Sequence, residues 1–229
     1  MSTRDRAARA VLFDLDGTLL DTAPDMGAAL NALRMETGLE PLAPATIRPH
    51  VSHGSAALIQ LAFGERHVRE LDGLRARFLD LYRARLACDT RLFAGGEWTL
   101  TELERRGLPW GVVTNKPGWL AEPLLEALGL AHRAGCVIAG DTLPERKPHP
   151  RPLLLGAERL ATHPSHCVYV GDAERDMVAA RAAGMVALVA GFGYIGDWEG
   201  AERWPQDGWL HTPEDLIAWL ESAPPLPPA

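Results

Sequence analysis

Two acidic side chains stand together at the end of a short apolar run near the start of the chain. Asp14 and Asp16 follow VLF, and Gly17 comes next, which permits a sharp turn. Acids in such a place can simply form a turn. Two carboxylates about 4 Å apart, however, repel by about 4 kcal/mol at an effective dielectric constant near 20. This repulsion favours a bound cation, and carboxylate oxygens are the ligands that Mg²⁺ prefers.

A second acidic cluster, GDAERD, follows another apolar run, CVYV. Asp172 lies at the turn and Asp176 one helical turn later. An Asp in a first helical turn is also a common cap, so Asp176 has a purely structural interpretation. Asp172 is a second acid at a strand end, and we expect it to face Asp14 and Asp16.

Three further residues have types and positions that suit anion binding. Thr114 and Asn115 end the apolar run WGVV. Taken alone they are best explained by a turn that ends the strand, but a hydroxyl beside backbone N–H groups can also hold an anion. The chain has 23 Lys and Arg residues but only two lysines, Lys116 and Lys147. Lys147 is followed by Pro148, and a compact ammonium placed there can balance both acids and a phosphate oxygen.

Buried strands must position these groups. Short, continuously apolar runs alternate with helical patterns, which predicts a doubly wound α/β domain with a parallel sheet. The predicted strands are 9–15, 110–115, 136–140, 167–172 and 186–191, and the predicted helices are 97–106, 120–128, 153–160, 176–183 and 214–221.

Residues 22–90 break this alternation and have helical patterns throughout, over 22–37, 55–63 and 65–87. We therefore predict a core formed by 1–21 and 91–229, with a small helical cap, 22–90, inserted after the first strand and above the strand ends. The most polar loop of the cap carries Arg48, His50, Ser52 and His53. These side chains either select the substrate or are solvated loop residues.

Composition limits the remaining possibilities. The chain has 229 residues, 47% of them hydrophobic, and a net charge of −7, which argues against a nucleic-acid or anionic membrane surface. No segment is apolar enough to span a membrane, and the three dispersed cysteines predict free thiols and a cytoplasmic location. The Trp-rich segment 198–209 is interpreted as a loop anchored by its rings or as a partner surface. The oligomeric state is not indicated.

Taken together and in this order, DLDGT at 14–18, Thr114, Lys147 and GDAERD at 171–176 resemble the four motifs of the haloacid dehalogenase superfamily. The resemblance covers about residues 11–219, and the helical insertion resembles the small cap of that family. Within the superfamily, the segments FDLDGTLLDTAPD, LFAG, WGVVTNKP, AEPLLEALGL and FGYI are similar to phosphoglycolate phosphatases and to N-acetylmuramic acid 6-phosphate phosphatases.

The resemblance implies a Mg²⁺-dependent phosphatase acting on a small phosphorylated metabolite. Asp14 would attack phosphorus and form an aspartyl phosphate, and Asp16 would act as general acid and then base. Mg²⁺ would be held by the side chains of Asp14 and Asp172 and by the backbone carbonyl of Asp16, with Asp176 orienting the ligands around the metal.

In the same resemblance, Thr114, the backbone at Asn115 and Lys147 would bind the phosphoryl oxygens. Asp16 favours phosphoryl transfer over dehalogenation, because a halide leaves without a proton. Two alternatives stay open: a sugar-phosphate mutase of the same superfamily, and a phospho-accepting signalling module without enzymatic activity.

Overall fold

A parallel β-sheet organises the larger part of the molecule. The computed structural model describes residues 8–64 and 68–222, and in them six strands pair in the order β5-β4-β1-β6-β7-β8. The strands are β1 (Ala10–Phe13), β4 (Trp110–Val113), β5 (Val137–Ile138), β6 (Cys167–Gly171), β7 (Val186–Ala190) and β8 (Gly208–Leu210). Each neighbouring pair is parallel. The predicted fold class, a doubly wound α/β core, is confirmed.

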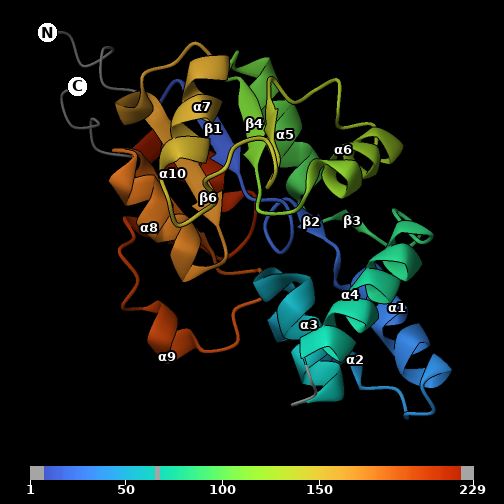
Figure 1. Ribbon diagram of the computed structural model, residues 1–229. Helices are drawn as coiled ribbons and strands as arrows, with labels where there is room; N and C mark the ends of the chain where they lie inside the picture. The colour runs from blue at the N-terminus through green and yellow to red at the C-terminus, as the bar shows by residue number, and fades with distance from the viewer. Residues whose placement is uncertain (1–7, 65–67, 223–229) are drawn as a thin grey trace, which may run out of the picture.

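Both faces of the sheet are covered by helices (Figure 1). Alternate residues of β1 enter two separate apolar clusters: Val11 and Phe13 lie in one, and Ala10 and Leu12 lie in the other. The first cluster includes residues of α5 (Gly96–Arg105), α6 (Gly118–Ala127) and α10 (Asp215–Ser222), and the second includes residues of α7 (Arg151–Arg159) and α8 (Glu174–Ala182). Burial on both faces explains why these strands are continuously apolar.

The Trp-rich segment 198–209 is more regular than the predicted loop. It contains the short helix α9 (Trp198–Ala201) and leads into β8, which pairs with β7 through Trp209 opposite Val189. Trp204 and Trp209 pack against the second apolar cluster, and Trp198 stacks on Trp209 at 5.5 Å between ring centroids. Anchoring of the segment by its rings therefore accounts for these residues. The sequence missed β8 because three residues are too few for a periodic signal.

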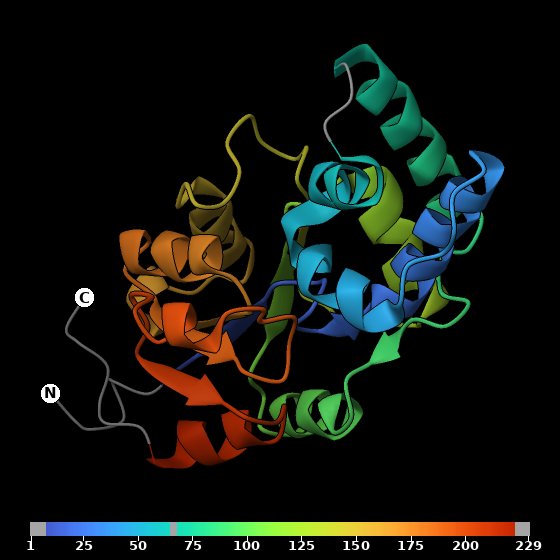
Figure 2. The same ribbon diagram turned by 90° about the horizontal axis from the view of Figure 1, so that it is seen from below.

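A group of helices lies apart from this core. These are α1 (Ala23–Glu36), α2 (Pro44–Ile47), the 3₁₀ helix Arg48–His53, α3 (Gly54–Phe63) and α4 (Val68–Arg83). Figures 1 and 2 show them gathered on one side of the molecule, over one end of the sheet. They pack around an apolar cluster that includes Leu30, Leu58 and Phe78 and that also contains Leu120 and Tyr194 of the core. Residues 65–67 of the predicted helix 65–87 lie outside the described residues. The polar loop that the sequence predicts in the cap forms the 3₁₀ helix Arg48–His53.

The chain crosses between core and cap at one narrow place. Strand β2 (Leu20–Asp21) on the way out pairs antiparallel with β3 (Arg91–Leu92) on the way back. In Figure 1 both lie between the two groups of elements. The division into a core, 1–21 and 91–229, and a cap, 22–90, stays a prediction. The paired crossings and the separate apolar cluster support it.

The helices and the cysteines agree with two expectations from the sequence. None of their helices is long and apolar enough to cross a membrane. Cys88, Cys136 and Cys167 carry free thiols, as the sequence predicts.

A buried carboxylate ties the start of α1 to the return crossing, and this yields a first prediction. Asp25 is fully buried and accepts hydrogen bonds from the backbone N–H groups of Asp89 and Thr90 and from the Thr90 hydroxyl, at 2.8–3.0 Å for its Oδ2. Replacing it by Asn puts an amide donor among these donors. We expect Asp25→Asn to lower the free energy of unfolding by about 1–3 kcal/mol in urea denaturation.

The matched control is Asp72→Asn on α4, where the acid is exposed. This change should alter stability by no more than about 0.5 kcal/mol. Equal stabilities for the two variants would contradict the role given to Asp25.

Candidate active site

Adjacent strands bring the predicted catalytic groups to one edge of the sheet. Asp14 directly follows β1, Thr114 follows β4 and Asp172 follows β6, and β1 lies between the other two. Because the strands are parallel, their carboxyl ends meet at the same edge, where ligands of such sheets bind. A cavity of about 530 Å³ opens there between core and cap, lined by Asp14, Asp16 and Thr114 from the core and by cap residues such as Ser52.

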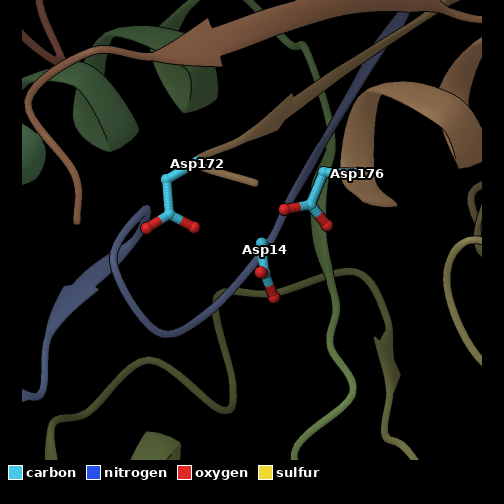
Figure 3. A group of neighbouring side chains, drawn as sticks. All are labelled: Asp14, Asp172 and Asp176. Atoms are coloured by element: carbon cyan, nitrogen blue, oxygen red, sulfur yellow. The ribbon is translucent and has the colours of Figure 1, made fainter. Parts of the chain in front are cut away.

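Three carboxylates surround one point at this edge. Oxygen atoms of Asp14, Asp172 and Asp176 lie within 4.8 Å of one another, and all three residues are buried (Figure 3). Oδ1 of Asp172 has no hydrogen-bond partner among the residues that the structure describes. A buried, unpaired carboxylate oxygen beside two other acids fits a hard divalent cation such as Mg²⁺. The Asp16 carboxylate is not a member of this trio.

Lys147 supplies a positive charge inside the cluster. Its Nζ lies 2.8 Å from Oδ1 of Asp14 and 2.8 Å from Oδ1 of Asp176. It also donates to the Val113 carbonyl at 2.9 Å and to the Tyr169 hydroxyl at 2.8 Å. The side chain is fully buried. The Val113 carbonyl, the Tyr169 hydroxyl and the two carboxylates together hold the ammonium beside Asp14. The sequence predicts this placement next to the acids.

Asn115 holds Lys147 by its backbone. The Asn115 amide donates to the Lys147 carbonyl at 2.9 Å and accepts from the Lys147 N–H at 3.0 Å. The side chain is thus engaged with the protein, so any anion contact at Asn115 comes from its backbone. Thr114 Oγ1 accepts from the Lys116 N–H at 3.1 Å, which leaves the hydroxyl proton available to an anion.

Asp172 has a perturbed acidity. Burial, and then the negative charges of Asp14 and Asp176, raise the pKa of Asp172 to about 7, although a hydrogen bond from the Ser52 hydroxyl at 2.6 Å and one from the Tyr194 N–H act in the opposite direction. Gly17 makes the close approach possible, because a Cβ there would lie 2.0 Å from Oδ2 of Asp172, and its φ of +81° is also one that favours glycine.

The structure brings in a lysine that the sequence left unassigned. Lys116 is buried, and its Nζ lies 2.9 Å and 3.2 Å from the two oxygens of Asp16 and 2.9 Å from the Tyr82 hydroxyl. Burial lowers the pKa of Lys116, but the charge of Asp16 and the contact with Tyr82 outweigh this effect and raise it overall. The scarcity of lysine, with one of two directly after Thr114 and Asn115, was the available signal.

Arg175 is a second residue that sequence reasoning missed. Its Nη2 donates to the Ser52 carbonyl of the cap at 2.7 Å and lies 3.9 Å from Oδ2 of Asp14. It thus places a further cation between the cap and the acidic cluster. Its position inside GDAERD, between two acids of the cluster, was a usable signal.

The four polar residues of the cap separate into two groups. Ser52 and His53 line the cavity, and burial lowers the pKa of His53. Arg48 instead pairs with Asp21 at the crossing, at 2.9 Å, with its guanidinium 4.7 Å from the centre of the Tyr194 ring. His50 lines a second cavity, which extends to α9 and is also lined by Ser52, His53 and Asp172. The structure therefore brings Ser52 and His53 to the cavity above Asp14, His50 only to the second cavity, and Arg48 to neither.

The raised pKa of Asp172 predicts a pH dependence for the metal-free protein. An unfolded Asp titrates near pH 4, so between about pH 4 and 7 the folded chain retains a proton that the unfolded chain has lost. The free energy of unfolding in EDTA should therefore decrease as the pH rises through this window. Mg²⁺ must displace that proton, so its stabilising effect should be larger at pH 8 than at pH 5.

Thermal unfolding with EDTA or Mg²⁺ at the two pH values measures both effects. Asp172→Asn is the control, because it lacks the titrating group and one metal ligand. If wild type and Asp172→Asn respond alike to pH and to Mg²⁺, the assignment of Asp172 is wrong.

Comparison with known proteins adds independent information. A family model described as haloacid dehalogenase-like hydrolase matches residues 11–190. The chain is 48% identical over 223 residues to a phosphoglycolate phosphatase of Xanthomonas campestris pv. campestris, covering 97% of this chain and 100% of that one. It is 40% identical over 216 residues to an N-acetylmuramic acid 6-phosphate phosphatase of Pseudomonas aeruginosa, covering 94% and 96%.

A solved structure has the same architecture. The crystal structure of a predicted phosphoglycolate phosphatase from Haemophilus somnus 129PT superposes with a TM-score of 0.81 at 26% identity, covering 95% of this chain and 98% of that one. The four motifs, the fold that brings them to one strand edge and the matched family lead to one conclusion: the chain belongs to the haloacid dehalogenase-like hydrolases.

Proposed function

We propose that this protein is a Mg²⁺-dependent phosphatase that hydrolyses a small phosphomonoester through an aspartyl-phosphate intermediate. The observation that carries the proposal is the surroundings of Asp14. This buried carboxylate lies at the floor of a cavity, between a carboxylate trio that fits a metal ion and the ammonium of Lys147. The names of the relatives support phosphomonoesters as the substrate class.

Each part of this arrangement has a task in the reaction. Asp14 attacks phosphorus in line with the leaving oxygen. The Thr114 hydroxyl, the backbone at Asn115 and the Lys147 ammonium hold the phosphoryl oxygens where negative charge develops. Asp14, Asp172 and the backbone carbonyl of Asp16 would hold Mg²⁺, which neutralises charge on nucleophile and phosphate, with Asp176 orienting this set.

Asp16 acts as the general acid and then as the general base. It protonates the leaving oxygen in the first half-reaction and takes a proton from water in the second. Its carboxylate lines the cavity without belonging to the metal-binding trio, so it is available for this exchange.

The substrate is a small phosphorylated acid or sugar. The two relatives are named for phosphoglycolate and for N-acetylmuramic acid 6-phosphate. A cavity of about 530 Å³ far exceeds a two-carbon acid and has the usual size for ligands as large as an amino-sugar phosphate. The volume therefore favours the larger substrate, and a direct comparison of rates decides between them.

A substrate panel tests both the reaction class and the substrate. The panel contains 2-phosphoglycolate, N-acetylmuramic acid 6-phosphate, N-acetylglucosamine 6-phosphate, a nucleoside monophosphate, β-glucose 1-phosphate and p-nitrophenyl phosphate. We expect phosphate release with Mg²⁺, its loss in EDTA, and the highest kcat/KM for N-acetylmuramic acid 6-phosphate. The N-acetylglucosamine ester lacks only the lactyl group, so this pair isolates recognition of that carboxylate.

Other outcomes favour the alternatives. Conversion of β-glucose 1-phosphate to the 6-phosphate without phosphate release indicates a mutase. A long-lived phosphoprotein without turnover indicates a signalling module. The best rate on 2-phosphoglycolate would contradict the argument from cavity volume.

Replacing the nucleophile gives a test that does not depend on the substrate. Asp14→Asn keeps the shape of the side chain but removes its nucleophilic charge, so we expect phosphate release to fall by at least about 10³-fold. Acid quenching during turnover should trap phosphate covalently on the wild type and not on the variant. Circular dichroism of the variant shows whether the fold is retained.

The control for this experiment is Asp141→Asn, an exposed acid on the rim of the same cavity. It should retain activity within about threefold. Substantial turnover by folded Asp14→Asn would overturn the nucleophile assignment.

A further inference from the structure

Lys116 forms a buried bridge that the proposed reaction does not yet explain. Its ammonium contacts both oxygens of Asp16 and donates to the Tyr82 hydroxyl, and it lies 4.5 Å from the centre of the Tyr82 ring. The Lys116 side chain is 4% exposed. A charge buried to this degree requires its partners, because losing one partner leaves the other charge unpaired in a low-dielectric site.

The two partners of Lys116 belong to different parts of the molecule. Asp16 follows β1 in the core, whereas Tyr82 lies on α4 of the cap. Tyr82 is fully buried, and its ring lies nearly parallel to that of Phe78 in the apolar cluster of the cap, at an angle of 8°. The Tyr82 hydroxyl therefore links the cap to Lys116.

The contacts of Asp16 distinguish its two oxygens. Oδ1 accepts from the Thr22 hydroxyl at 2.7 Å and from Lys116 at 2.9 Å. Among the described residues, Oδ2 has only the longer contact to Lys116, at 3.2 Å. Oδ1 is thus held by two donors. Oδ2 is the oxygen that is left to exchange a proton with a ligand in the cavity.

The expected position of the leaving group agrees with this geometry. In-line attack places the leaving group opposite the nucleophile. Asp14 lies at the strand ends below the cap, so the leaving group of a bound phosphomonoester points toward the cap. Asp16 is held on that side by a lysine that contacts a cap residue.

We propose that Lys116 is a positioning residue, which holds Asp16 so that Oδ2 faces the leaving oxygen, and that Tyr82 makes this position depend on the seated cap. The inference rests on the proposed phosphatase function. As the Asp14–phosphorus bond forms, the bond from phosphorus to the leaving oxygen breaks and its electron pair stays on that oxygen. The oxygen then receives the proton from Oδ2 of Asp16.

Leaving-group dependence tests this role, and a merely structural defect would not produce it. The variants are Lys116→Met, which removes the ammonium, and Tyr82→Phe, which removes only the hydroxyl and keeps the ring on Phe78. Each is assayed with the best alkyl phosphate of the panel, whose alkoxide requires a proton, and with 2,4-dinitrophenyl phosphate, whose phenolate leaves without one. Values of kcat/KM are compared, because they report steps up to departure of the leaving group.

We expect Lys116→Met to lower kcat/KM for the alkyl phosphate by about 10²-fold and for dinitrophenyl phosphate by less than about threefold. Tyr82→Phe should show the same selectivity with a loss of roughly three- to tenfold, since Lys116 keeps its contacts with Asp16. Tyr82→Phe decides the question if Lys116→Met does not fold.

Arg83→Met is the matched control. Arg83 is the neighbour of Tyr82 on α4 and also crosses to the core, with its guanidinium 5.8 Å from the centre of the Trp119 ring, but it has no contact with Asp16 among the described interactions. Because this variant keeps the Tyr82 hydroxyl on Lys116, any change in kcat/KM should be the same factor for both substrates.

Two results would overturn the inference while leaving the phosphatase function intact. Equal losses on both substrates for Lys116→Met would show that Lys116 acts on the nucleophile or the fold. An unchanged alkyl-phosphate rate in Tyr82→Phe would remove the link to the cap. If wild type with Mg²⁺ hydrolyses neither substrate, the proposed function fails together with the inference.

Discussion

The crowding of acids at one strand edge is the constraint on which the rest of this structure depends. Asp14, Asp172 and Asp176 are buried with oxygens within 4.8 Å of one another. At this separation each pair of charges repels by several kcal/mol unless a cation lies between them. Lys147 balances part of the charge, and burial together with the charges of Asp14 and Asp176 raises the pKa of Asp172. A divalent cation among these acids would balance their charge, and the site could then accept a phosphate.

The order and direction of the strands bring these charges together. Strands β4, β1 and β6 are neighbours and parallel, so three short peptide segments end at the same edge. Their interiors are apolar on both faces, which anchors the strands firmly enough to hold like charges together. Gly17 provides the remaining space, since any side chain there would collide with the Asp172 carboxylate. The motif DLDGT thus combines Asp14, the proposed nucleophile, with the turn that leaves room for Asp172 of the neighbouring strand.

The cap completes the site instead of merely covering it. Ser52 donates to Asp172, the Ser52 carbonyl accepts from Arg175, and Tyr82 reaches Lys116. Each of these contacts joins a cap residue to a charged group of the core. At the crossing, the Tyr194 hydroxyl donates to Asp21 and accepts from the Ala23 N–H, so a loop beyond β7 also braces the cap. Cap position and the electrostatics of the site are therefore coupled.

Sequence alone predicted the alternating strands and helices, the helical insertion and the core motifs, because these are local patterns of apolar period and residue type. It missed strand β8, whose three residues carry no period, and it gave no role to Lys116 or Arg175. It also grouped Arg48, His50, Ser52 and His53 as one polar loop. In the 3₁₀ helix, Ser52 and His53 line both cavities, His50 lines only the second, and Arg48 pairs with Asp21. Which of these four meets the cavity depends on how the cap sits on the core.

The order and chemistry of DLDGT, Thr114, Lys147 and GDAERD by themselves predicted an acidic site suited to a cation and a phosphate, because residue type fixes charge and hydrogen-bonding capacity. Only the tertiary structure decided the partners: that Asn115 clamps Lys147, that Lys116 joins Asp16 to Tyr82, and that one oxygen of Asp172 remains unpaired. The physical reason is that these contacts join residues far apart in the chain across packed elements, and no local pattern encodes the relative placement of those elements.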